Sequence, residues 1–278
     1  MPIDPAHLLA MPPIPARQAW SVRDTMIYAL GIGASELDFV YEDGLKPLPM
    51  MCCVLGYPGF IWQKPEFGMT WQKIVHAEQA IEIHGAVPVE GTITADTIVE
   101  RIVDKGAAKG ALITTSRRIL DGDGNHFATV RSTSIARGDG GFGGDSSAPP
   151  PTAMPDDRAP DITLSLPTAD TQALLYRLSG DYNPLHIDPA VARTGGFERP
   201  ILHGMCTYGV AGRALIASLC ANDPTRLVSM ACRFSAPVYP GETIRTEIWN
   251  DASGKARFRA RVEERDVIVL NNGSVEFR

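Results

Sequence analysis

The chain has 278 residues, of which 26 are Lys or Arg and 32 are Asp or Glu, so its net charge is −6. A hydrophobic content of 44% excludes a disordered chain, which would combine low hydrophobicity with high charge. The acidic balance also argues against nucleic-acid binding, because neutralising phosphates requires a basic surface.

A segment rich in Gly, Pro, Ser and Asp, residues 138–160, is the sharpest change of composition along the chain. It has almost nothing to bury, and we interpret it as a linker. It separates residues 1–137 from residues 161–278. The two halves resemble each other, since each reads as helices followed by alternating strands.

The first half opens with a predicted helix that Ser21 caps, with Asp24 three residues later, and that ends at Gly31. Residues 47–63 are uncharged but are interrupted by prolines, so they form no long helix. Two strands, residues 111–120 and 126–136, are joined by a predicted turn at residues 121–125.

The second half repeats this order. Thr168 is the candidate N-cap of a helix that stops at Gly180. Residues 204–219 are small and almost uncharged, which predicts a buried helix, and its glycines Gly209 and Gly212 would let a sheet approach closely. A second strand turn is expected at residues 271–273. These elements predict an α+β duplication.

One short loop concentrates residues with chemical potential. Asp181, Asn183 and His186 fall within six residues, just after the helix stop. Pro184 and the Asp188–Pro189 pair restrict the backbone on both sides. A fixed Asp/His pair can hold one water molecule and move protons. The alternative is that Asp181 only caps a turn and His186 is a structural histidine.

His203 and Gly204 stand at the start of the predicted buried helix. The N–H of a glycine at a helix N-terminus can donate to an oxyanion that develops on a carbonyl. This set of groups indicates proton transfer beside an activated carbonyl. We expect His203 only to position the turn.

Residues 178–188, LSGDYNPLHID, and residues 196–209, GFERPILHGMCTYG, resemble the MaoC-like family and, within it, the (R)-specific 2-enoyl-CoA hydratases of type 2. Residues 28–34, 75–79, 104–106, 140–144 and 233–241 carry the same resemblance, which therefore covers nearly the whole chain.

The resemblance implies a double hot-dog fold, with two antiparallel sheets each wrapped on a helix. It implies reversible syn addition of water to a trans-2-enoyl-CoA, giving a (3R)-3-hydroxyacyl-CoA. Asp181, His186, Asn183 and Gly204 would be the catalytic residues. The substrate contacts carried over by motif are His76, Ala77, Lys105, Tyr182, Pro184, Leu185 and Phe234. Ala77 stands where the family often has glycine.

The duplication predicts that only one copy is catalytic. Aligning the two helices places Gly33 opposite Asp181 and Asp38 opposite His186, so the first copy lacks the acid–base pair. We therefore expect residues 1–137 to accommodate the acyl chain in an open groove, and residues 161–278 to carry the chemistry.

Further expectations concern partners and location. No cofactor is expected, since coenzyme A is part of the substrate, and no metal site, membrane partner or nucleic-acid partner is expected. The five cysteines are expected to be buried free thiols. With no signal peptide or peroxisomal tripeptide recognised, a cytoplasmic location is expected, and the resemblance to the family implies a homodimer. The alternatives are a hot-dog acyl-CoA thioesterase and a non-catalytic acyl-CoA-binding subunit.

Overall fold

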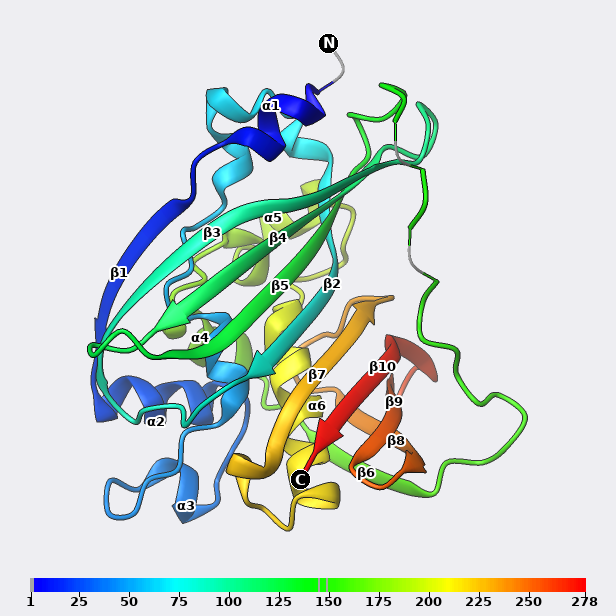
Figure 1. Ribbon diagram of the computed structural model, residues 1–278. Helices are drawn as coiled ribbons and strands as arrows, with labels where there is room; N and C mark the ends of the chain where they lie inside the picture. The colour runs from blue at the N-terminus through cyan, green and yellow to red at the C-terminus, as the bar shows by residue number, and fades with distance from the viewer. Residues whose placement is uncertain (1–2, 145, 149) are drawn as a thin grey trace.

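Ten strands form one antiparallel sheet in the computed structural model, which describes residues 3–144, 146–148 and 150–278 (Figure 1). The strand order is β1-β3-β4-β5-β2-β7-β10-β9-β8-β6. The strands are β1 (Ile14–Trp20), β2 (Ile74–Ile83), β3 (Gly91–Asp104), β4 (Ala111–Leu120), β5 (His126–Ala136), β6 (Ile162–Pro167), β7 (Leu227–Phe234), β8 (Thr243–Ala252), β9 (Lys255–Val262) and β10 (Val267–Phe277).

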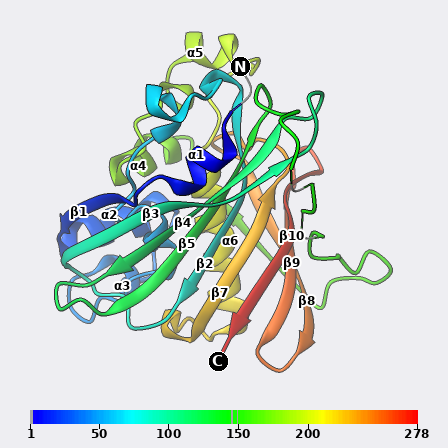
Figure 2. The ribbon, with the colours of Figure 1, turned by 45° about the horizontal axis from the view of Figure 1, so that its top comes forward.

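The strand order shows the duplication. In each half the first strand pairs with the third, and the fourth, fifth and second follow in that order. The predicted double hot-dog fold is therefore confirmed. The two expected sheets are one continuous sheet, because β2 and β7 pair from Glu78 opposite Arg233 to Glu82 opposite Ser229. An ion pair of 2.7 Å between Arg233 Nε and Glu78 Oε1 lies on this seam. Figure 2 shows the sheet running without a break from β1 to β8.

The strand pair β4 and β5 has the predicted bounds, and its turn is the predicted one. Asp121 Oδ1 accepts the backbone N–H groups of Asp123 and Asn125, which is the usual way an aspartate closes a tight turn. The turn predicted at residues 271–273 is wrong. Strand β10 runs through it with a register shift between Asn271 and Ser274, so the residues form a bulge. The chain reverses at residues 263–266, where Asp266 has a φ of 50°.

Six α-helices are present in the described residues, and most are short: α1 (Pro5–Ala10), α2 (Val22–Gly31), α3 (Leu37–Val40), α4 (Gln172–Tyr176), α5 (Pro189–Thr194) and α6 (Gly204–Leu219). The 3₁₀ helices are η1 (Pro49–Cys53), η2 (Ile61–Gln63), η3 (Pro65–Phe67), η4 (Trp71–Lys73), η5 (Arg177–Ser179), η6 (Pro184–His186) and η7 (Pro224–Arg226).

Helix α2 begins as predicted, with a capping box in which Ser21 and Asp24 bond each other's backbone. The N-cap predicted for the second half is wrong, because helix α4 starts later and its N-cap is Thr171. Thr168 is buried, and its hydroxyl donates to the Glu242 carbonyl at 2.8 Å. Tyr28 and Tyr176, which occupy matching positions in the two copies, pack with their ring centroids 6.2 Å apart.

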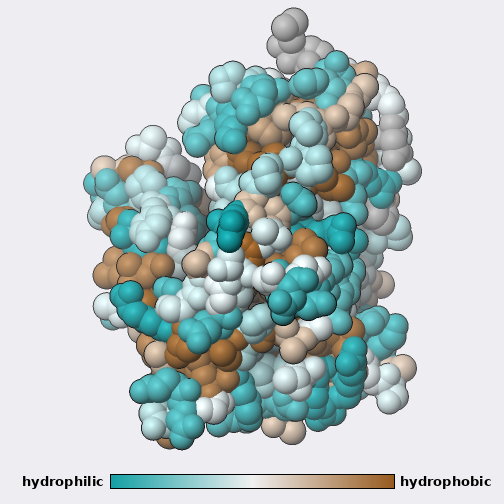
Figure 3. Space-filling model, turned by 60° about the vertical axis from the view of Figure 1, so that its left-hand side comes forward, coloured by the Kyte–Doolittle hydropathy of each residue, from teal (hydrophilic) through white to brown (hydrophobic). Residues whose placement is uncertain are grey.

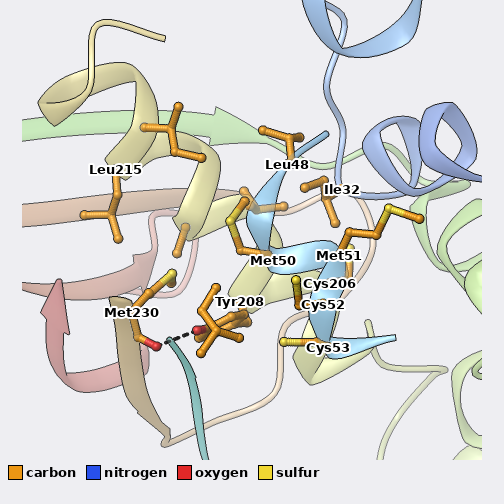
Figure 4. Packing of buried hydrophobic residues seen from close by; sticks show 14 of the residues in the cluster. Ile32, Leu48, Met50, Met51, Cys52, Cys53, Cys206, Tyr208, Leu215 and Met230 are labelled. Atoms are coloured by element: carbon orange, nitrogen blue, oxygen red, sulfur yellow. Dashed lines mark hydrogen bonds between the residues drawn. The ribbon is translucent and has the colours of Figure 1, made fainter. Parts of the chain in front are cut away.

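Helix α6 is the central helix and is buried as predicted. Figure 4 shows its residues Cys206, Tyr208 and Leu215 packed among sulfur-containing and aliphatic side chains, with the Tyr208 hydroxyl donating to the Met230 carbonyl at 2.7 Å. Gly209 and Gly212 permit a close approach, as expected, but the segments that approach are not strands of the sheet. A Cβ at Gly209 would lie 2.4 Å from Ile32, and one at Gly212 would lie 2.6 Å from Met50. Both contacts come from segments of the first half.

Among the described residues of the first half, no helix is equivalent to α6, so the expectation that each sheet wraps on a helix is wrong for this half. Its long uncharged segment, residues 47–63, forms only η1 and η2, as its prolines predicted. Helix η1 contacts β2, β5 and α6, so it covers part of the concave face of the first half-sheet.

The five cysteines are buried and free, as expected. Burial raises the pKa of the Cys52 thiol to about 12.

The outer surface is mixed in character. Figure 3 shows apolar groups on one face divided into separate patches by hydrophilic side chains. Within the described part of the chain, no helix has both the length and the apolar character needed to span a bilayer. Between β5 and β6, the described residues contain no helix or strand.

Replacing Gly209 with valine should lower the free energy of unfolding by about 1–3 kcal/mol, because the added methyl groups would overlap Ile32. Urea unfolding followed by fluorescence measures this change. Ala217→Val, at a half-buried position of the same helix, is the control for the helix propensity of valine. Equal stability of the two variants would contradict the close contact.

Candidate active site

The loop that carries Asp181 and His186 is held in place by backbone contacts. Gly180 ends η5 with a φ of 115°, a conformation that favours glycine. The Asn183 side chain caps η6 by accepting the Leu185 N–H at 3.0 Å. Asp188 caps α5, accepting the Ala190 N–H at 2.7 Å. The sequence predicted a loop fixed on both sides, and the structure confirms it.

His186 is buried with one nitrogen engaged. Its Nδ1 lies 2.9 Å from the Ile201 carbonyl oxygen and must carry the proton to donate there. The remaining nitrogen, Nε2, is therefore an acceptor when the ring is neutral. Burial lowers the pKa of His186, although the Ile201 hydrogen bond and the Asp181 charge oppose this shift. The neutral ring is thus the favoured form near neutral pH.

His203 contacts both ends of the loop that carries Asp181 and His186. Its Nε2 lies 3.2 Å from the Asp181 carbonyl oxygen, and its ring stacks on His186 with centroids 3.7 Å apart. Burial, together with the neighbouring His186, lowers the pKa of His203 to about 4. A neutral His203 that donates to the Asp181 backbone is a positioning residue, as expected.

Asp181, His186 and His203 place one polar atom each within 4.8 Å of one another. Such a trio has the residue types of a metal site. However, a metal ion lies in the plane of an imidazole that binds it, and these two rings are stacked at 28°. One nitrogen of each ring is also engaged by a backbone carbonyl, His186 Nδ1 by Ile201 and His203 Nε2 by Asp181, so the geometry fits an acid–base pair on a supporting histidine better than a metal site.

Gly204 is the first residue of α6. Within the described residues, no protein acceptor takes its N–H. A Cβ at this position would lie 3.3 Å from the Phe234 ring, which in turn lies 4.8 Å from the His76 ring. Gly204 therefore lies beside Phe234, which packs near His76, and its N–H is at the positive end of the α6 dipole.

The other predicted contact residues lie in three places. Ala77 is buried on β2, beside His76. Tyr182 is 58% exposed, and the Arg177 guanidinium lies 5.0 Å from its ring. Pro184 and Leu185 belong to η6 of the catalytic loop. Lys105 follows β3, which β4 and β5 separate from β2, and no described contact joins it to the Asp181 loop.

A cavity of about 340 Å³ connects Asp181 with the first half of the chain. Asp181, Gly180, Tyr176 and Met205 contribute to its wall from the second half, while most of the lining comes from β2 to β5 and residues 53–62. His76 also lines it. The predicted groove in residues 1–137 is present.

The corresponding position in the first copy has no acid–base pair, as the alignment predicted. Gly33 has a φ of 77° and faces Arg213 and Gln172 of the second half. Asp38 forms a surface ion pair with Lys46 at 2.7 Å. Gly33 has no side chain to act as an acid or a base, and the described contacts of Asp38 include no histidine.

Sequence reasoning missed the function of Asp104, although its motif was noticed. The Asp104 carboxylate accepts the N–H groups of Gly106, Gly141 and Gly143 at 2.7–2.8 Å. The Gly141 bond is the largest cause that lowers the pKa of Asp104. Asp104 therefore joins residues 104–106 to residues 140–144. This contact fixes the glycine-rich segment over the end of β3.

Comparison with known proteins agrees with this architecture. Residues 19–138 match the family described as MFE-2 hydratase 2 N-terminal domain, and residues 152–272 match the MaoC like domain. The 3-hydroxyacyl-thioester dehydratase Y of Mycobacterium tuberculosis is 39% identical, over 100% of this chain and 99% of its own. The probable enoyl-CoA hydratase 2 of Dictyostelium discoideum is also 39% identical, over 90% of this chain and 88% of its own.

Among solved structures, a MaoC-like dehydratase from Phytophthora capsici superposes with a TM-score of 0.91 and 38% identity, covering 99% of both chains. The chain therefore belongs to the MaoC-like dehydratase family, in the group whose N-terminal half is of the hydratase 2 type.

Proposed function

We propose that this protein catalyses the reversible hydration of trans-2-enoyl-CoA to (3R)-3-hydroxyacyl-CoA. The observation that carries the proposal is the placement of Asp181 and His186 next to the open N-terminus of a buried helix, with Asp181 lining a cavity of about 340 Å³. The names of two relatives, an enoyl-CoA hydratase 2 and a 3-hydroxyacyl-thioester dehydratase, support the same reaction in its two directions.

In this proposal a water molecule binds between the Asp181 carboxylate and His186 Nε2. Its oxygen attacks the β-carbon of the enoyl group while the pair takes one of its protons. The pair returns a proton to the α-carbon, so that the enzyme ends as it began. Because both groups lie on one side of the substrate, hydroxyl and hydrogen add to the same face. Asn183 holds the loop in this geometry.

The thioester oxygen is proposed to accept the Gly204 N–H. As water adds to the β-carbon, negative charge moves onto this oxygen, and a donor at a helix N-terminus stabilises it. Phe234 and His76 would hold the thioester beside this donor. Ala77, Lys105, Tyr182, Pro184 and Leu185 are proposed to contact the remainder of coenzyme A.

Each proposed domain has its own role in the reaction. Residues 161–278 supply the chemistry, residues 1–137 accommodate the acyl chain, and residues 138–160 link them. The reaction balances without a cofactor, since water is the only co-substrate. The buried free thiols support a reducing compartment such as the cytoplasm, and the formation of a homodimer stays a prediction from the resemblance.

The central prediction is that crotonyl-CoA and a longer trans-2-enoyl-CoA lose their double bond on incubation with the protein. Asp181→Asn should lower kcat/KM by about 100-fold or more, because an amide cannot exchange the proton. Loss of absorbance of the enoyl thioester measures the rate, and an (R)-specific dehydrogenase reads the product's chirality. Release of free thiol would indicate a thioesterase instead, and inactivity on every chain length would indicate a binding subunit.

The role of Gly204 can be tested with a pair of variants. Proline fits the first position of a helix but has no N–H, whereas alanine adds the same Cβ and keeps the donor. Relative to Gly204→Ala, Gly204→Pro should lower kcat by about 100-fold. Steady-state kinetics on crotonyl-CoA measures the difference. If both variants are equally active, the N–H does not stabilise the transition state.

The buried His203 predicts that stability decreases in acid. The unfolded chain takes up a proton on this residue near pH 6.5, the folded chain only near 4, so the free energy of unfolding falls between these values. His203→Gln keeps a donor for the Asp181 carbonyl but cannot ionise. Between pH 7.5 and 5, its loss of stability should be smaller than that of the wild type by roughly 1–2 kcal/mol. Urea unfolding at both pH values measures this, and identical losses would contradict it.

A further inference from the structure

Arg117, on β4, is an unusual residue for the wall of an acyl-chain cavity. It is 6% exposed and lines the cavity that begins at Asp181. A buried guanidinium normally has a carboxylate partner. Among the described residues, no Asp or Glu forms an ion pair with Arg117, and the groups that influence its charge are Cys52, Cys53 and Tyr57.

One part of Arg117 has a structural role. Its Nη2 donates to the carbonyl oxygens of Cys52 and Cys53, at 3.2 and 2.7 Å, and so fastens the end of η1 to the sheet. This contact does not explain the rest of the group. Nε is buried and has no hydrogen-bond partner among the described residues, and the charge is not neutralised.

Arg117 is not alone in this wall. It pairs across the sheet with Thr97 of β3, whose hydroxyl is also buried without a described partner. Thr115 and Ser132, which are opposite each other on β4 and β5, also line the cavity. In β9, the strand of the second half that matches β4, the inward positions are Ala256, Phe258 and Ala260. The polar wall is thus specific to the half without a central helix.

The opposite wall of the same cavity is largely apolar and includes Val54, Phe60, Ile61 and Trp62. Tyr57 connects the polar wall with the catalytic loop. Its ring lies 5.7 Å from the Arg117 guanidinium. Tyr57 is 50% exposed, and it lines the cavity together with Asp181 and Arg117. An acyl chain that fills this cavity from Asp181 would therefore meet the wall that carries Arg117.

We propose that the preferred substrates are enoyl-CoAs whose acyl chain carries an oxygen acceptor toward its distal end, and that Arg117 and Thr97 bind this oxygen. A plain alkyl chain would cover Arg117 with methylene groups and leave its N–H groups without an acceptor, which costs binding free energy. A carboxylate would accept these hydrogen bonds and neutralise the charge, and a hydroxyl would accept the bonds alone. This inference rests on the proposed hydratase function.

The test compares medium-chain trans-2-enoyl-CoAs of equal length that end in a methyl, a hydroxyl or a carboxyl group. For at least one chain length, the wild type should show a kcat/KM about ten-fold or more higher for an oxygen-bearing chain than for the methyl chain. The carboxyl and hydroxyl arms then distinguish charge neutralisation from hydrogen bonding. A preference for the methyl chain at every length overturns the inference.

Arg117→Met should remove or reverse this preference while activity on crotonyl-CoA, which has only a methyl group beyond its double bond and no distal group to bind, is retained. Arg118→Met is the matched control, since Arg118 is the exposed neighbour on the same strand. If Arg117→Met does not fold, Thr97→Val tests the same wall and should reduce the preference. An unchanged preference in the folded variant overturns the assignment.

These outcomes separate the two proposals. If the wild type is inactive on crotonyl-CoA and on all longer chains, the hydratase function fails. If it hydrates crotonyl-CoA but does not distinguish the distal groups, only the assignment of Arg117 fails.

Discussion

The pairing of β2 with β7 is the interaction on which the rest of the structure depends. It makes two five-stranded sheets into one, and it sets the first half beside the second in a single register. His76 lies near this seam on β2, and Phe234 ends β7, so the two rings that flank the Gly204 donor come from different copies. A shift of this ladder would move the cavity of the first half away from the loop of the second half that carries Asp181 and His186.

The two copies share a strand order but differ in what fills their concave face. In the second half, α6 covers the sheet and its glycines admit Ile32 and Met50 from the first half. In the first half, prolines limit the corresponding segment to short 3₁₀ turns. The face that is left without a helix is lined partly by polar side chains and opens toward Asp181. The short 3₁₀ turns of the first half therefore leave room for the cavity that the proposed function assigns to the acyl chain.

Much of the site could be predicted because it is local in sequence. Asp181, Asn183 and His186 lie in one loop whose prolines and caps fix it, and Gly204 is recognisable from the start of an apolar helix. Features that depend on distant contacts were not predictable. Asn271 to Gly273 has the residues of a turn but lies in a bulge, because β7 and β9 pair on both sides of it. Arg117 alternates with Arg118 and shares its face of β4 with the buried Ile113 and Ile119, but its bonds to the carbonyl groups of η1 come from a segment far away in the sequence.

The fusion of two copies into one chain has a consequence for how such a protein can change. A symmetric pair of identical subunits must use the same residues for bond making and for recognising the chain of its substrate. Here the acid–base pair and the wall with Arg117 are encoded far apart in one polypeptide. Under the proposed function, a substitution in the wall would alter which substrate is accepted while Asp181 and His186 stay untouched. Selectivity and reactivity can therefore evolve separately within one gene.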